Sequence, residues 1–305
     1  MSNALEQFRQ TILATLGYAP PDINDDGAIH RFSTNGQRGD KSGYYAYHPD
    51  SNAAGVYGDW RTGLQSTWCT KSDNAMTNAE RDAHKQRTKA MKAQRDADLL
   101  ITQQQASQRV AALWSKADTA ANHPYLQRKG ISGYGIKVFG DTLLIPLRDT
   151  AGKLHSLQTI SPEGDKRFHS GGRIKGCYHL MGQPNGVLIV CEGYATGASL
   201  HKATGHAVAV AFNASNLEAV ILALYRKYPT LAMVVAADDD WRTEGNPGLS
   251  YAKSAALSVG GVSVAPQFLA DRPAKATDFN DLAALSGLDA VRACFAELEG
   301  FICRH

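Results

Sequence analysis

Two apolar runs in the second half of the chain end directly on acidic residues. The first is Val187–Cys191, followed by Glu192, and the second is Leu231–Ala237, followed by Asp238–Asp240. Apolar runs of this length without alternation suit strands that are buried on both faces, as in a parallel sheet covered by helices. Carboxylates just past such strands lie where open α/β sheets bind their ligands. Because clustered acids repel one another unless a cation shares them, this pattern predicts a Mg²⁺-type, metal-dependent phosphoryl-transfer site.

The segments around these runs alternate between strand and helix patterns. We predict helices over 196–204, over 217–228 with Asn216 as its cap, from a turn at 244–248 to about 258, and over 288–299. Further strands are predicted over 207–211 and 262–265. Strands and helices that alternate at this size predict a parallel sheet with right-handed crossovers. A third acidic segment, KATDFNDLAAL, brings Asp278, Asn280 and Asp281 before the last helix.

The first half of the chain has a different texture. Apolar spacing over 4–17 predicts a helix, and the Gly- and aromatic-rich stretch 20–70 predicts a small β-meander with turns at Asn35-Gly36 and Tyr57-Gly58. Its mixed aromatic and basic residues are typical either of a surface for single-stranded nucleic acid or of a small β-domain core. Residues 76–117 contain no Gly or Pro and predict one long helix or two joined ones.

Basic residues gather in the segment between this helix and the first acidic run. Strands are predicted at 143–147 and 154–160, joined by a turn over 149–152, and the loop 161–176 is rich in glycine. The basic side chains here are Arg128, Lys129, Arg148, Lys166, Arg167, His169, Arg173 and Lys175. Glycine lets the backbone approach a ligand and Lys or Arg neutralises phosphate, so the pattern favours phosphate binding over a solvated loop.

Composition narrows the class of protein. The 305 residues, 43% of them hydrophobic, include five cysteines without a CxxC pair, so neither a zinc ribbon nor a disulfide framework is indicated. No signal-peptide pattern and no apolar run of about 20 residues is present, which favours a cytoplasmic protein without membrane contact. Residues 1–185 hold 23 Lys and Arg against 17 Asp and Glu, whereas 186–305 hold 9 against 12. A basic first half beside an acidic second half suits a polyanion held next to a metal site. The excess of basic residues in 1–185 is, however, ordinary for a segment of that length.

The acidic motifs together resemble those of the Toprim domain found in DnaG-type primases, topoisomerases and some nucleases. VCEGYATG is similar to the family's strand-Glu-Gly motif, AADDD to its DxD motif, and KATDFNDL to the third acidic segment of primases. The resemblance implies Glu192, Asp238 and Asp240 as catalytic residues, and these three with Asp278 as metal ligands for Mg²⁺ or Mn²⁺. It extends upstream to about residue 120. The residues that we expect to bind nucleotide or template are Arg148, Lys166, Arg167, Arg173, Lys175, Asn280 and Asp281.

The resemblance implies a DNA primase that makes short RNA primers on single-stranded DNA from nucleoside triphosphates. Thr196 stands where DnaG-type enzymes often carry an acid, and the Cys/His quartet of the primase zinc ribbon is absent. Both departures favour the primases of plasmids, phages and other mobile elements. A replicative helicase or a single-strand binding protein is an implied partner; no P-loop is present, so no helicase is fused within these residues. A Toprim nuclease with the same metal cluster, or a non-catalytic single-strand binding protein, remains an alternative.

The predicted fold class is α/β, a Toprim-like parallel sheet flanked by helices. We expect four segments: a β-rich domain over 1–72, which resembles a metal-free counterpart of the zinc ribbon in its position and texture; a helical connector over 73–117; a basic α+β subdomain over 118–185; and the Toprim domain with its C-terminal helix over 186–305.

Overall fold

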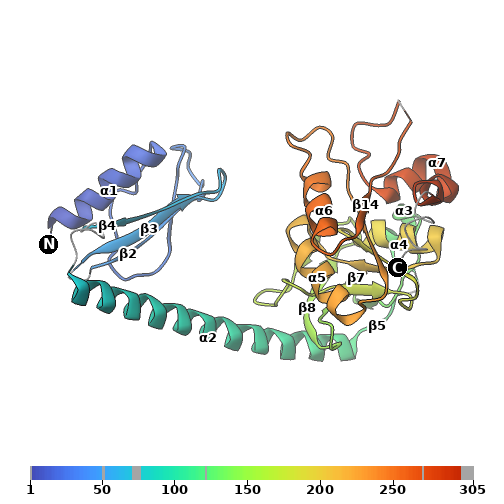
Figure 1. Ribbon diagram of the computed structural model, residues 1–305, viewed down its shortest axis with the longest axis horizontal. Helices are drawn as coiled ribbons and strands as arrows, with labels where there is room; N and C mark the ends of the chain where they lie inside the picture. Colours follow the sequence, from blue (N-terminus) through green and yellow to red (C-terminus); the bar gives the residue numbers. More distant parts are fainter. Residues whose placement is uncertain (1, 50–51, 71–76, 121, 270, 297–305) are drawn as a thin grey trace. The chain divides into compact units, whose positions relative to one another are not determined.

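The computed structural model describes residues 2–49, 52–70, 77–120, 122–269 and 271–296. The chain divides into two compact units, Met1–Gln94 and Arg95–His305 (Figure 1). The predicted helical connector is one helix, α2 (Asn78–Lys116), whose residues belong partly to each unit. Within the described ranges, no helix is long and apolar enough to cross a membrane.

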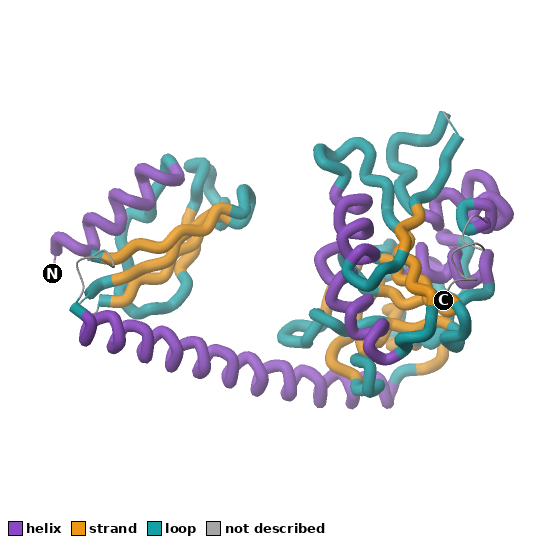
Figure 2. Tube along the Cα trace, viewed as in Figure 1, coloured by secondary structure: helices purple, strands orange, loops and turns teal. Residues whose placement is uncertain are grey.

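The first unit is a four-stranded antiparallel meander with one helix on it (Figure 2). Its elements are α1 (Ser2–Leu16), β1 (His30–Phe32), β2 (Gly43–His48), β3 (Ala54–Asp59) and β4 (Leu64–Cys69). Phe8 and Ile12 of α1 are fully buried and pack against aromatic side chains from one face of the sheet, including Tyr45 and Tyr57. The predicted meander is therefore confirmed, and aromatic residues form its core.

The predicted turn at Tyr57-Gly58 is wrong. Both residues lie inside β3, where Tyr57 pairs with Tyr45 and Gly58 pairs with Tyr44. Glycine is needed at this point because a Cβ on residue 58 would meet the Tyr44 hydroxyl and the carbonyl oxygen of Leu64. The glycine therefore marks a close approach on the sheet surface and not a reversal of the chain.

The second unit begins with a five-stranded antiparallel sheet. Its strands are β5 (Asp118–Thr119), β6 (Lys137–Phe139), β7 (Thr142–Arg148), β8 (Leu154–Ile160) and β9 (Lys166–Phe168), in that order, and a short helix α3 (Pro124–Lys129) lies between the first two. The predicted hairpin is confirmed: the backbone N–H of Gly152 donates to the carbonyl of Asp149 in the turn between β7 and β8.

The acidic runs lie in the other sheet of this unit. Its strand order is β10-β12-β11-β13-β14, in which β11 pairs in parallel with β12 and β13. The elements are β10 (His179–Met181), β11 (Val187–Cys191), α4 (Tyr194–Thr204), β12 (Ala207–Val210), the 3₁₀ turn η2 (Ala214–Asn216), α5 (Leu217–Lys227), β13 (Ala232–Ala236), α6 (Pro247–Leu257), β14 (Val262–Val264) and α7 (Phe279–Ala293). The predicted parallel sheet is confirmed for four strands, and β10 adds an antiparallel edge.

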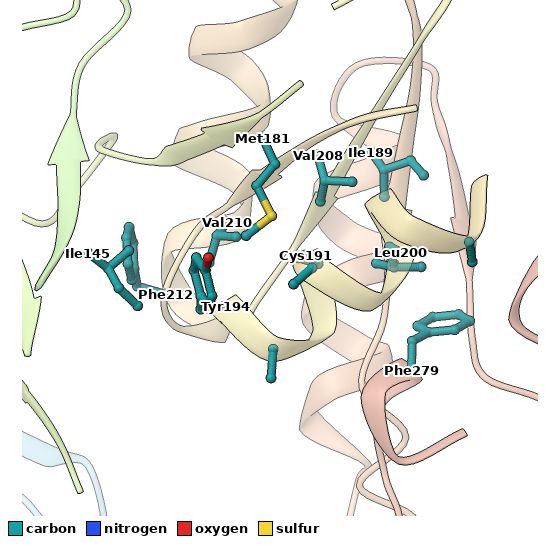
Figure 3. Packing of buried hydrophobic residues seen from close by; sticks show 14 of the residues in the cluster. Ile145, Met181, Ile189, Cys191, Tyr194, Leu200, Val208, Val210, Phe212 and Phe279 are labelled. Carbon is teal, nitrogen blue, oxygen red and sulfur yellow. The ribbon is translucent and has the colours of Figure 1, made fainter. Parts of the chain in front are cut away.

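Both faces of this sheet are buried, which explains why the strand sequences show no alternation. One face packs against α4, α7 and the neighbouring sheet, with Ile189, Leu200, Phe279 and Ile145 in one cluster (Figure 3). The opposite face packs against α5 and α6 in a second cluster. A strand enclosed in this way delivers the residue at its carboxyl end to the sheet edge with little freedom of position.

The last helix begins earlier than predicted. It was expected over about 288–299, but α7 starts at Phe279 with Asp278 as its N-cap, and residues 297–299 lie outside the described ranges. Gly287, with φ 83°, interrupts the helix, so the predicted start at 288 coincides with its second part. The proposed domain boundaries after 117 and 185 fall between elements, and the boundary after 72 lies outside the described residues.

Candidate metal and phosphate site

Four carboxylates come from the carboxyl ends of two adjacent parallel strands and from the start of α7. Glu192 directly follows β11, and Asp238 and Asp240 follow β13, its paired neighbour. Asp278 caps α7, where its carboxylate accepts from the backbone N–H of Asp281 at 2.8 Å and from the Thr196 hydroxyl at 3.1 Å. The topology therefore brings together side chains that are up to 86 positions apart in the sequence.

These carboxylates interact strongly with one another. Burial, together with the charges of Asp278, Glu192 and Asp240, raises the pKa of Asp238 to about 8. Burial, and then the charge of Asp240, also raises the pKa of Glu192. The nearby Lys166 opposes both shifts. The site is thus a cluster of half-buried negative charge that the charge of Lys166 partly offsets.

The donor set fits a hard divalent cation. One carboxylate oxygen of Asp238, Oδ1, is buried and has no hydrogen-bond partner among the described atoms, although its neighbours are acids. A buried, unpartnered carboxylate oxygen among like charges is costly, and a cation would satisfy it. As the side chains stand in the described ranges, no three carboxylate, histidine or cysteine ligands are close enough together to enclose a metal. Binding would therefore draw the carboxylates closer together.

The backbone around the site is shaped for these acids. The N–H of Gly248, near the start of α6, donates to a carboxylate oxygen of Asp240 at 3.1 Å. A Cβ at residue 248 would meet that same oxygen and the backbone carbonyl of Asp238, so only glycine allows this approach. Asp239 has other partners: Arg272 donates to one of its oxygens at 2.7 Å and Asn246 to the other at 2.6 Å.

Strand β9 brings Lys166 to the acids. Phe168, on the same strand, contacts the ring of Phe212 edge to face at 6.1 Å, and the backbone N–H of Phe212 donates to the carbonyl of Glu192 at 2.8 Å. Phe212 has φ 72°, a left-handed conformation that is strained for an aromatic residue. The strained residue links the strand that carries Lys166 to the backbone of Glu192. No sequence signal indicated it.

The other predicted basic residues differ in how much of each side chain is available. Arg167 and Lys175 are exposed. Arg148 is half-buried; it donates to the carbonyl of Gly152 at 2.8 Å and lies 5.7 Å from the Trp114 ring centre. Arg173 is half-buried, 3.7 Å from a carboxylate oxygen of Asp149. Of the five basic residues expected to bind nucleotide or template, Lys166, Arg167 and Lys175 are therefore the exposed ones.

The third acidic segment is tied to α3, a contact that sequence reasoning missed. Asn280 is 3% exposed, and its amide donates to the carbonyl of Lys129 and to the Ser199 hydroxyl. Asp281 accepts from the backbone N–H of Thr277 and lies 3.8 Å from the Lys129 ammonium. Asn280 thus joins elements within the unit and presents almost no surface to a ligand.

On its other side, α3 holds the turn that leads into β9. Arg128 donates to the carbonyl of Pro162 at 2.9 Å, and the Tyr125 ring lies against Gly164. The short helix therefore spans from the start of α7, near Asp278, to the turn that precedes Lys166. Its only sequence signal was His123-Pro124, a helix start in which His123 accepts from the Tyr125 N–H.

Asn216 was predicted to cap α5, and it stands at the cap position without making the capping hydrogen bond. Its side chain instead connects the basic loop to the parallel sheet. It accepts from the backbone N–H of Gly176 at 2.8 Å and donates to the carbonyls of Cys177 and Ala211 at 3.1 and 2.8 Å. The residue is 3% exposed, so these bonds are shielded from water.

We expect Asn216→Ala to destabilise the second unit by about 2–3 kcal/mol, because buried partners on the loop and on the sheet lose their hydrogen bonds. The loop should also detach, so trypsin should cleave after Arg173 and Lys175 faster than in the wild type. Urea denaturation and peptide mapping of a short tryptic digest measure both effects. Asn213→Ala is the matched control, since within the described part of the chain its amide oxygen accepts an exposed bond from Ser215 and no buried one. Equal cleavage of both variants would contradict this role of Asn216.

Comparisons with known proteins bear on this site. A family model described as a Toprim domain matches residues 187–289. Two Escherichia coli proteins named DNA primase TraC are each 35% identical to this chain, over 257 residues (80% of this chain, 24% of the relative) and 277 residues (86% and 19%). The chain therefore spans about a quarter and a fifth of the lengths of these two relatives.

Two solved structures are similar at lower identity. The DnaG primase catalytic domain bound to ssDNA has a TM-score of 0.45 at 15% identity, covering 65% of this chain and 80% of that chain. The primase fragment of the bacteriophage T7 primase-helicase protein has a TM-score of 0.43 at 16% identity, covering 59% of this chain and 76% of that chain.

Proposed function

Residues 187–289 of this chain are a Toprim domain, and from that premise we propose that the chain is a DNA primase. It would make short RNA primers on single-stranded DNA by metal-dependent nucleotidyl transfer. The observation that carries the proposal is the excess of buried carboxylate around Glu192 and Asp238, faced by Lys166 from the adjoining basic sheet. The 35% identity to proteins named DNA primase TraC supports the same activity.

The acids suit the needs of nucleotidyl transfer. Asp238, Asp240 and Asp278, with Glu192, would hold the divalent cation, which we propose to be Mg²⁺ or Mn²⁺. Bound there, the cation would neutralise triphosphate charge and make the attacking hydroxyl more acidic. The unpartnered Oδ1 of Asp238 and the hard oxygen donors support this assignment.

The bond changes assign work to this chain's own side chains. The 3′-hydroxyl oxygen attacks the α-phosphorus of the incoming nucleotide, a P–O bond forms, and pyrophosphate leaves with the electrons of the broken P–O bond. Glu192, whose pKa is raised by burial, suits acceptance of the hydroxyl proton. Lys166 lies close enough to the acids to compensate charge on the triphosphate.

The remaining basic residues would hold the polyanions. Arg167 and Lys175 are exposed and would contact backbone phosphates of the template or nucleotide, whereas Arg148 and Arg173 would first exchange internal partners. Asp281 would act through Lys129 and the start of α7. Asn280, being buried, would support the site from beneath and would not touch the template.

Replication of a plasmid, phage or other mobile element is the proposed setting, and it is supported by the TraC relatives. A replicative helicase or a single-strand binding protein would be a partner in that setting. We also propose the four-part domain organisation, in which residues 118–185 form the basic subdomain that precedes the Toprim domain.

The direct test is synthesis on single-stranded DNA. The full chain, labelled ribonucleoside triphosphates and unlabelled single-stranded DNA should yield short oligoribonucleotides with Mg²⁺ or Mn²⁺ and none with EDTA. Labelled DNA incubated with metal but without nucleotides should stay intact. Cleavage of that DNA would favour the nuclease alternative, and binding without synthesis under either metal would favour a non-catalytic binding protein.

A further inference from the structure

The face of the first unit's sheet that points away from α1 carries an aromatic and basic surface. Arg31 of β1 and Tyr44 of β2 are paired across adjacent strands, so their side chains lie on the same face of the sheet. The neighbouring residue in this row is Gly58, above which the Tyr44 hydroxyl lies. Tyr45, next along β2, instead contacts Phe8 on the α1 side. The two faces are thus chemically distinct.

Trp60 lies on top of this row. Its ring centre is 4.8 Å from that of Tyr44 and 5.3 Å from the Arg31 guanidinium carbon. Because Tyr44 and Arg31 are neighbours in one layer of the sheet, both support the indole from the sheet side. The residue is nevertheless 60% exposed. One face of the ring is therefore held and the other faces solvent.

The charges around Trp60 are sorted by sign. The basic residues Arg31, Arg38, Lys41 and Arg61 are all exposed. The acids between them are turned inward: Asp59 is 6% exposed and accepts from the Thr34 hydroxyl, and the Asp40 side chain, 11% exposed, is paired with the Arg61 guanidinium at 2.7 Å. Four basic side chains stand against these two acids, so the surface keeps an excess of positive charge although Asp40 offsets the charge of Arg61.

Hydrogen bonds hold the backbone that carries the indole. The N–H of Trp60 donates to the carbonyl of Ser42 at 3.0 Å, and the next residue, Arg61, has its N–H bound by Asp59 at 2.8 Å. Arg31 donates to the carbonyl of Lys41 at 2.9 Å, which holds the guanidinium beside the ring. A large apolar ring kept in place at the surface loses little conformational freedom when a ligand stacks on it.

We propose that the surface formed by Arg31, Tyr44, Trp60 and Arg61 is a binding site for single-stranded nucleic acid. An unpaired base stacks on the open face of Trp60, and the surrounding guanidinium and ammonium groups contact the phosphates on either side. Stacking on aromatic rings together with phosphate contacts is how single strands are bound without base-edge readout. A duplex keeps its bases stacked on one another and cannot offer one to the indole. The occupant being a primer template rests on the proposed function; the binding itself does not.

The test measures binding in the absence of catalysis. The full chain is titrated into fluorescein-labelled oligothymidylate in EDTA without nucleotides, and anisotropy gives the Kd. Trp60→Ala should raise the Kd about 5- to 50-fold, since loss of stacking on one base has an effect of this size. Trp60→Phe, which keeps an aromatic face, should stay within about threefold of the wild type. Ile29→Ala, a change at another exposed apolar residue of this unit, should leave the Kd unchanged.

Charge provides an independent arm of the experiment. Arg31→Gln should reduce the slope of log Kd against log salt concentration by about 1, the value for one phosphate contact. A hairpin duplex should compete poorly with the single strand. The inference is overturned if Trp60→Ala binds as the wild type does, or if duplex competes equally, provided that the variants retain the wild-type circular dichroism spectrum. If Trp60 governs binding but no primer is ever made, the inference stands and the proposed function fails. If primers are made but the Kd does not change in Trp60→Ala, the proposed function stands and the inference fails.

Discussion

Glu192→Gln and Asp238→Asn should each lower primer synthesis by at least about 100-fold while leaving single-strand binding within a factor of two. Removing a positioned proton acceptor costs about 10²–10⁴-fold in rate, and removing the carboxylate whose Oδ1 is buried and unpartnered weakens the cation site directly. The amides preserve volume, so the sheet edge should stay folded. Gel analysis of labelled primers at saturating nucleotide, with anisotropy on single-stranded DNA, separates lost chemistry from lost binding.

Two aspartates provide matched controls for this experiment. Asp289→Asn changes a side chain that is 92% exposed on α7 and should synthesise primers as the wild type does. Asp239→Asn lies within the same acidic triplet, but its oxygens are bound by Asn246 and Arg272, so its main effect should be on stability. Wild-type synthesis by Asp238→Asn at every metal concentration would sink the assignment. If Asp239→Asn lowers kcat as much as Asp238→Asn does and its stability is unchanged, the catalytic role belongs to Asp239.

The sequence predicted the elements that bring the acids together. β11 was predicted at its observed bounds and β13 to within one residue at each end. A strand enclosed by helices on both faces must be apolar at every position, so it ends where the first charge appears. The same rule located Glu192 and Asp238 at the sheet edge, because the first charged residue marks the end of such a strand.

Contacts between distant segments were not predictable from pattern. Gly58 is a residue type typical of turns, but here its lack of a Cβ leaves room for the Tyr44 hydroxyl from the neighbouring strand. Asn216 has the position of a helix cap, yet it makes stronger use of its amide by bonding to the loop at 174–177. In both cases the local signal was present and a tertiary partner determined its use. The strained Phe212 and the two-sided contacts of α3 gave no local signal at all.

The second unit should lose stability as pH rises when no divalent cation is present. The pKa of Asp238 is about 8 in the folded protein, against an ordinary value of 3.8, and that of Glu192 is also raised. A group with a raised folded-state pKa binds its proton more tightly in the folded state than in the unfolded state. Loss of that proton as pH rises therefore lowers the free energy of unfolding. Stability should therefore be highest below about pH 4 with respect to this group, and should fall progressively up to about pH 8.

Asp238→Asn should remove most of this dependence and stabilise the protein at pH 8 by on the order of a few kcal/mol, because an amide carries no charge at any pH. Millimolar Mg²⁺ or Mn²⁺ should stabilise the wild type in the same pH range, since a cation that binds only the folded state adds to its stability. It should do so much less for the variant. The substitution that abolishes synthesis is thus expected to raise stability, as befits a site where buried charge is kept for chemistry.

The fully buried thiol of Cys191, the last residue of β11, reports opening of this sheet. Alkylation of Cys191 after brief exposure to increasing urea, quantified by mass spectrometry, gives a midpoint for the second unit that does not depend on the first. Wild type and variant are compared at the same pH, which cancels the intrinsic pH dependence of alkylation. In EDTA, the urea midpoint of the wild type should decrease as the pH is raised from 5 to 8. The urea midpoint of Asp238→Asn should stay nearly constant over the same range. Parallel slopes for the two proteins would mean that Asp238 is ionised at an ordinary pKa and that the carboxylates do not share a buried site.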